Sequence, residues 1–263
     1  MSHFSCGVIS NDGQTVEELL APYSESLNVA PYISTAKKEL EEEHQKLIKE
    51  AEEPGSWANK NEKERHFSYS KMTLMEFTKN HYGDDALIDL EGNLLTTYNP
   101  NTKWGWYVIG GRWDDLLKIK SCFGGGRSNE AHISEVDWEA LNRISKKDER
   151  WYRRFWEINV LGKKMTRAEE KKHEYFSMYD ENYYLEYYGN VEKYIKINGA
   201  FSTYAVVTPD GVWHAIGKMG MWGFSSEKPE DVEGWSGSWY DNFVKPYFQS
   251  KEDHYITILD CHQ

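Results

Sequence analysis

The sequence predicts an α+β protein whose sheet is mainly antiparallel, is built from both ends of the chain and carries helical insertions. Three observations lead to this prediction. Short, apolar and β-prone segments lie close to both ends, at residues 4–9 and 255–259. Each half of the chain holds a hairpin signal, at 87–98 and at 201–216. Helical patterns fill most of the sequence between these strands, as expected for the α+β class.

The chain is predicted to form a single α+β domain, 1–263, with a helical insertion at about 134–190. With 39% hydrophobic and 15% aromatic side chains, 263 residues can bury a substantial core. One sheet is expected to contain the strands near 4–9, 104–109, 202–208, 212–216 and 255–259.

The first third after the opening strand is predicted to be mostly helical. Residues 36–53 are almost all good helix formers with a narrow apolar face, so a surface helix is expected there, ended by Pro54-Gly55. The polar residues 56–64 indicate a loop. A second helix is expected over 70–82, stopped by the glycine that follows.

The middle of the chain is predicted to return to strands. Residues 104–109 alternate as a strand does, and Gly110-Gly111 interrupts it. Residues 116–123 are expected to pair with that strand. The glycines at 124–126 lack the flanking residues of a nucleotide-binding loop, so a plain loop is expected.

Helices are expected through the insertion, the last one running from the capping box of Thr166 and Glu169 to about residue 188. The turn Pro209-Asp210-Gly211 then joins the two strands of the clearest hairpin in the chain. A helix at 238–250 is expected before the final strand.

The charge distribution excludes one class of function. A formal net charge of −12 disfavours general binding to DNA or RNA, which requires a basic field. Residues 143–172 nevertheless carry eleven Lys or Arg against five Asp or Glu, and residues 1–93 carry 18 acids against nine bases. These runs are either two solvated faces, or an anion-attracting patch and an acidic surface that imitates nucleic acid.

The three widely spaced cysteines Cys6, Cys122 and Cys261 indicate reduced thiols, so no disulfide framework, structural metal or other cofactor is expected. The sequence has no run of about 18 apolar residues and no basic start followed by an apolar region. We therefore expect neither a membrane span nor a secretory signal, no membrane partner, and a cytoplasmic location. Nothing in the sequence indicates the oligomeric state.

The unusual side chains of the protein are concentrated at residues 98–115. Three of the 11 tryptophans lie there, beside Arg112 and the Gly110-Gly111 pair, which permits a ligand or another backbone to approach closely. Large flat rings and cations suit a planar, anionic, nucleotide-like ligand, unless the same rings form the core of a sheet. The candidate ligand-binding residues are Lys103, Trp104, Trp106, Arg112, Trp113, Trp213, His214, Lys218 and Trp222.

Three histidines, His3, His214 and His262, are candidates for acid–base catalysis. The unit His3-Phe4-Ser5 has the His-x-Ser form that occurs twice in two-histidine phosphoesterases. Its possible counterparts at 66–68 and 132–134 do not lie in strand-like runs. Alternatively, Asp260 and His262 share one face of the last strand and could join His214 as an acid and base pair or as metal ligands.

Four segments resemble the motifs of an uncharacterised family of proteins from bacteriophages and actinobacterial genomes. They are Met-Ser-His-Phe-Ser at 1–5, Tyr-Asn-Pro-Asn-Thr-Lys-Trp-Gly-Trp-Tyr-Val-Ile-Gly-Gly-Arg-Trp at 98–113, Thr-Pro-Asp-Gly-Val-Trp-His at 208–214 with Gly-Lys-Met-Gly at 217–220, and Asp-Cys-His at 260–262. The chain has Ser5 where these relatives have Thr, and Gly105 where they have Asp, so the resemblance implies no catalytic acid at that position. It implies a phage or mobile-element protein and no particular reaction.

Three functions therefore stand as hypotheses. The first is an immune-evasion protein of a phage or mobile element that binds and sequesters a nucleotide-like signalling molecule in an aromatic and cationic pocket, in the cytoplasm of the host cell. The second is a phosphodiesterase-like enzyme that degrades such a molecule. The third is an acidic protein that inhibits a host defence nuclease, in which case its partner is a host defence protein.

Overall fold

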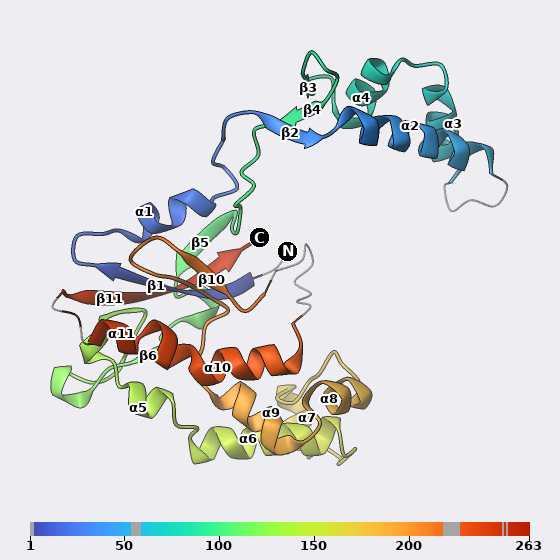
Figure 1. Cartoon of the computed structure of the whole chain (residues 1–263). Coiled ribbons are helices and arrows are strands. Elements are labelled where there is room, and N and C mark those ends of the chain that lie inside the picture. The colour runs from blue at the N-terminus through green and yellow to red at the C-terminus, as the bar shows by residue number, and fades with distance from the viewer. Residues whose placement is uncertain (1–2, 54–58, 218–226, 249, 251) are drawn as a thin grey trace. The chain divides into compact units, whose positions relative to one another are not determined.

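The computed structural model describes residues 3–53, 59–217, 227–248, 250 and 252–263 (Figure 1). The chain divides into two compact units. Unit 1 comprises Met1–Ser24 and Asn101–Gln263, and unit 2 comprises Glu25–Pro100. The sequence led us to expect one domain, and it gave no sign that residues 25–100 form a compact unit of their own.

A six-stranded sheet forms the centre of unit 1, with the strand order β10-β9-β1-β11-β5 and β8 paired with β11. Its two long strands, β1 (His3–Asn11) and β11 (His254–His262), come from opposite ends of the chain and pair antiparallel along their whole length. Only the pairing of β1 with β9 is parallel among the ladders of this sheet. The shorter strands are β5 (Trp106–Ile109), β8 (Glu130–His132), β9 (Ala205–Val207) and β10 (Trp213–Ala215).

The fold is therefore α+β, as predicted, and the expected strands do share one sheet. The strong hairpin signal is also confirmed, because β9 and β10 pair antiparallel with Val207 opposite Trp213. The pairing of β1 with β11 explains why both ends of the sequence are apolar. Each of these strands is buried along most of its length.

The two faces of the central sheet are covered by different helices (Figure 1). On one face, which we call the α1 face, Leu19 and Leu20 of α1 (Val16–Leu20) pack against side chains that include Phe4 and Cys261. On the other, the α10 face, Trp239 and Phe243 of α10 (Pro229–Phe243) pack with a second set of strand residues, namely Ile9, Val206, Ile256 and Ile258. Side chains alternate along a strand, so the rest of β1 and β11 can be assigned to a face by counting in twos.

The helical part of unit 1 follows β8 and consists of α5 (Trp138–Leu141), α6 (Lys146–Asn159), α7 (Arg167–Lys172), α8 (Glu181–Tyr188) and α9 (Val191–Gly199). Aromatic side chains of α6, α8 and α9 form a core of their own, including Phe155, Trp156, Tyr184 and Tyr194. After α10, the short α11 (Lys245–Phe248) leads to the last strand. None of the helices in the described segments is both long and apolar enough to cross a membrane.

In its described residues, unit 2 contains a three-stranded antiparallel sheet and three helices. Its helices pack around Leu40, Tyr69 and Phe77, which are fully buried. The elements are β2 (Tyr32–Thr35), α2 (Lys37–Glu52), α3 (Lys60–Tyr69), α4 (Leu74–Tyr82), β3 (Leu87–Ile88) and β4 (Leu94–Thr96), and β3 with β4 is the hairpin expected at 87–98.

Three local predictions were wrong. The expected loop at 56–64 is helical from Lys60, because Asn59 and Glu62 form a capping box. The helix expected from 166 to 188 is two helices, since His173 takes a left-handed conformation with φ of 49° that ends α7. Residues 116–123 form one short strand, β6 (Leu117–Lys118), and a 3-10 helix at Ser121–Phe123, and β6 pairs with β7 (Arg127–Ser128) and not with β5.

Candidate functional site

His3 and Asp260 are joined by a hydrogen bond at one end of the central sheet. The distance from His3 Nδ1 to Asp260 Oδ1 is 2.7 Å, and only 3% of Asp260 is exposed. An ionised carboxylate can only accept, so His3 Nδ1 donates the proton. In a neutral imidazole this leaves Nε2 as the basic nitrogen, which is the state required of a general base.

The second carboxylate oxygen of Asp260 accepts the backbone N–H of Arg112 at 3.1 Å. This contact requires the preceding residue to be a glycine. Gly111 has a φ of 58°, and a Cβ there would lie 2.5 Å from the Cβ of Asp260. The Gly-Gly-Arg segment, which the sequence marked as unusual, thus holds the carboxylate that orients His3.

His262 lies beside His3 and completes a cluster of rings. Its imidazole stacks on the indole of Trp106, with ring centroids 4.8 Å apart and planes inclined by 10°. It meets His3 edge-on at 5.1 Å, and His3 meets Trp106 at 5.3 Å. The strand register causes this arrangement, because His262 is opposite His3 on β1 and opposite Trp106 on β5. We call these four residues, His3, Trp106, Asp260 and His262, the histidine cluster.

The histidine cluster lies on the α10 face of the sheet, since Asp260 and His262 follow Ile258 in steps of two. It remains open to solvent on one side, where Trp106 is 45% exposed. Arg112 is exposed as well, and its guanidinium has no ion pair with any residue that the structure describes. The cluster therefore offers a basic nitrogen, a second imidazole and an aromatic surface, and the backbone of Arg112 lies against it.

A separate cavity of about 450 Å³ lies on the α1 face at the same end of the sheet. Two of the predicted ligand-binding residues, Lys103 and Trp213, line it together with Phe4 and Tyr204. Burial and the adjacent carboxyl of Glu227 raise the pKa of Tyr204, so its hydroxyl stays protonated at neutral pH. The other described residues that line it are Thr102, Ala215, Gly217 and Gln263.

The other predicted ligand-binding residues occupy structural positions or separate places. The indole N–H of Trp104 donates to the carbonyl of Leu20 at 3.1 Å, on the α1 face. Trp113 is partly buried and packs against the core cluster of the α10 face. Lys218 and Trp222 lie outside the described residues. The structure therefore does not gather the predicted set into one pocket.

His214 is not part of the histidine cluster. It pairs with Val206 on β9, its ring meets Phe243 at 5.2 Å, and its Nε2 is 3.4 Å from the hydroxyl of Thr208. Its strand lies two strands away from β1 in the sheet, and His214 is level with Gly7, four residues beyond His3. These two offsets place His214 roughly 16 Å from His3. Asp260 and His262 thus join His3, and the alternative in which they join His214 is wrong.

In the part of the chain that the structure describes, no three His, Cys, Asp or Glu side chains are grouped so as to hold a metal ion.

Sequence reasoning did not identify Phe4, Tyr204 or Thr102 as residues lining a cavity. No local pattern in the sequence could have identified these three residues, because each belongs to a different segment of the chain.

Comparisons with protein-family models, with curated proteins and with solved structures found no match to this chain.

Proposed function

We propose that this protein is a phosphodiesterase-like enzyme that cleaves a nucleotide-like molecule by general acid–base catalysis at the histidine cluster. The observation that carries the proposal is the 2.7 Å hydrogen bond from His3 to the buried Asp260, with His262 in ring contact beside it. A carboxylate that fixes the tautomer of a histidine is a recurring feature of catalytic bases.

In the proposed reaction, His3 Nε2 removes a proton from a water molecule as its oxygen attacks the phosphorus. The bond between phosphorus and the leaving oxygen breaks, and His262 in its imidazolium form donates a proton to that oxygen. The products are a phosphomonoester and an alcohol from a phosphodiester, or two phosphomonoesters from the pyrophosphate of an NAD derivative, and the two histidines exchange their protonation states. Each proton transfer of this kind typically contributes about 10²–10⁴-fold to the rate.

The neighbours of the two histidines suit the rest of such a substrate. The exposed face of Trp106 can stack with a nucleobase, and stacking on an aromatic ring contributes about 1–3 kcal/mol per base. Arg112 supplies a guanidinium fork for the phosphate oxygens. The resemblance to phage proteins supports a role in immune evasion, in which the enzyme would remove a nucleotide signal from the host cytoplasm.

The test is turnover by wild type and by His3→Asn. The asparagine amide can still donate to Asp260, but it has no basic nitrogen, so we expect turnover to fall by at least about 100-fold while the melting temperature is retained. The substrates are cyclic dinucleotides and NAD derivatives, with Lys118→Ala, a change of an exposed lysine on β6, as the control. A bell-shaped dependence of kcat/KM on pH is expected, because one imidazole must be neutral and the other protonated.

Two outcomes would contradict this proposal. One is that no compound of the panel is consumed by the wild type. The other is that His3→Asn and Lys118→Ala retain the same turnover, in which case the hydrogen bond between His3 and Asp260 serves only to join β1 to β11.

A further inference from the structure

We propose that the cavity on the α1 face is a separate binding site for a nucleoside monophosphate, which it holds without chemical change. This cavity is distinct from the histidine cluster, because its wall residue Phe4 and the catalytic candidate His3 are neighbours on β1 and project from opposite faces of the sheet. The inference does not depend on the proposed catalytic function.

Among the described residues, three aromatic rings wall the cavity and suit a planar base. Phe4 meets Tyr204 at a centroid distance of 5.4 Å and Trp213 at 6.2 Å. Tyr23 also fixes the position of Trp213. The backbone N–H of Trp213 donates to the hydroxyl of Tyr23 at 3.0 Å, and the centroids of the Trp213 and Tyr23 rings are 5.2 Å apart. Rings fixed in this way lose little conformational entropy when a ligand binds.

Two donors in the same cavity suit a phosphate. The side chain of Lys103 has no ion pair with any described residue, and its backbone N–H is anchored to the carbonyl of Tyr23 at 2.8 Å. Next to it, Thr102 Oγ1 is buried and has no hydrogen-bond partner among the described residues. A buried hydroxyl is normally satisfied, so a ligand oxygen is a fitting partner.

The size and the chemistry of the cavity favour binding over turnover. A volume of about 450 Å³ lies within the range of small-ligand sites. None of the described residues that line it is a histidine, an aspartate or a glutamate, and the adjacent carboxyl of Glu227 accepts the hydroxyl of Tyr204 at 3.4 Å, so the described lining presents no histidine–carboxylate pair like that of the histidine cluster. This is the property required of a protein that sequesters a nucleotide-like signal.

The experiment is a titration with adenosine 5′-monophosphate, followed by calorimetry and by tryptophan fluorescence. Adenosine and inorganic phosphate are titrated separately. We expect the monophosphate to bind, and Lys103→Met, which keeps the aliphatic stem, to weaken binding by at least about tenfold, because the charge-assisted contact to phosphate is lost. Lys118→Ala is the matched control and should bind as wild type does. His3→Asn should also bind as wild type does.

The inference is overturned if the monophosphate does not bind in the millimolar range, or if Lys103→Met and Lys118→Ala bind it equally. It is also overturned if adenosine binds as tightly as the monophosphate, since Lys103 then has no phosphate to contact. Binding that survives in a protein with no turnover would reject the proposed catalytic function alone. Turnover without binding at this cavity would reject the present inference alone.

Discussion

At the scale of single residues, Asp260 joins three candidate residues that lie far apart or in different motifs of the sequence, namely His3, Arg112 and His262. It binds His3 from the start of the chain and the backbone of Arg112 from the middle, and it precedes His262 by two residues. The tight backbone at Gly111 exists because this carboxylate fills the space where a Cβ would lie. An unusual motif at one place in the chain is thus explained by a residue almost 150 positions later.

Gly111→Ala should therefore destabilise the protein and disturb the histidine cluster. A non-glycine residue at a φ of 58° is strained by about 1–3 kcal/mol, and the clash with Asp260 adds to this cost. The control is Gly125→Ala, where φ is 69° and the nearest atom to a Cβ would be 3.7 Å away. Denaturant unfolding measures both variants. Equal losses of stability would show that the contact with Asp260 does not decide the need for glycine.

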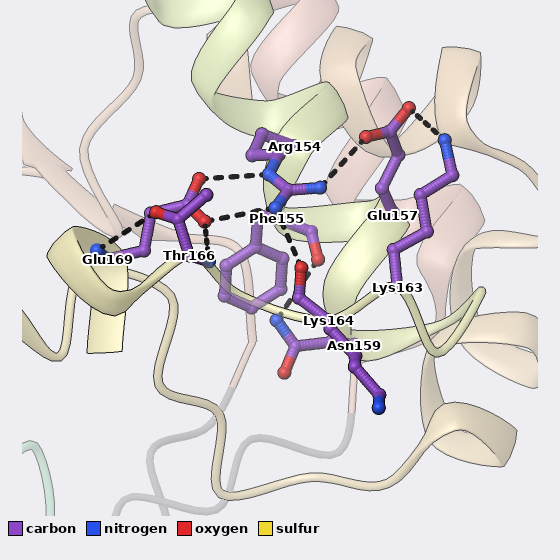
Figure 2. A network of polar contacts seen from close by, with 8 residues as sticks. All are labelled: Arg154, Phe155, Glu157, Asn159, Lys163, Lys164, Thr166 and Glu169. Atoms are coloured by element: carbon purple, nitrogen blue, oxygen red, sulfur yellow. Dashed lines mark hydrogen bonds and ion pairs between the residues drawn. The ribbon is translucent and has the colours of Figure 1, made fainter.

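At the scale of elements, the polar network in Figure 2 fastens α7 to α6. Arg154 on α6 donates through Nε and Nη2 to the two carboxylate oxygens of Glu169 on α7, both at 3.0 Å. It also contacts Glu157, which Lys163 approaches to 2.8 Å. Glu169 accepts in addition from the backbone of Thr166, so one carboxylate both caps α7 and binds the neighbouring helix.

This network predicts an acid-sensitive contribution to stability. The hydrogen bonds from Arg154, with those from Thr166, lower the pKa of Glu169 to about 2. The unfolded pKa is about 4.3, so the stabilisation is complete above that value and is lost as pH falls from about 4.3 toward 2. Glu169→Gln should remove this part of the dependence, whereas Glu170→Gln, an exposed change on the same helix, should retain it.

The measurement is the difference in melting temperature between wild type and each variant at pH 5 and at pH 3. The gap between wild type and Glu169→Gln should be larger at pH 5. A gap that stays constant between the two values would mean that Glu169 contributes no charge-dependent stability.

At the scale of the whole molecule, unit 2 is an insertion whose ends leave and re-enter unit 1 at neighbouring places. Within unit 1, the carbonyl of Tyr23 accepts the backbone N–H of Lys103 at 2.8 Å, and Ser24 forms a bridge with Trp104. Residues 25–100 carry 15 acidic against nine basic side chains and the rest of the chain carries 28 against 22, so the same excess of six acids is spread over 76 residues in unit 2 and over 187 in unit 1. The hypothesis of an acidic inhibitor of a host nuclease therefore concerns unit 2 more than unit 1.

Replacing residues 25–100 by a short glycine-serine linker should leave unit 1 folded. The central sheet, its two covering helices and the histidine cluster all come from outside the deleted range. We expect near-UV circular dichroism to retain a cooperative unfolding transition, and any turnover to persist. An unfolded product would contradict the division into two independent units. Inhibition of a nuclease, if wild type has it, should be lost in this variant.

The prediction of the fold from sequence was good where the signals are local. The opening strand, the hairpin with the turn at Pro209-Asp210-Gly211 and the helix of residues 36–53 were all expected, and all are present. The helix that begins at Lys60 was missed although its capping box of Asn59 and Glu62 was present in the sequence. The compact unit at 25–100 could not be foreseen, because it depends on which helices pack together.

The sequence by itself determined the α+β class, the joining of both chain ends in one sheet and the identity of His3 and His262 as candidates, because turn residues, caps and apolar periods act over a few positions. Only the tertiary structure decided which candidates share a site. Trp104 precedes β5, which begins at Trp106, and it packs on the α1 face, whereas Trp106 stacks on His262 on the α10 face, so the two tryptophans lie on different sides of the sheet. The meeting of His3 with Asp260, 257 positions later, depends on the register between β1 and β11, and no local pattern encodes that register.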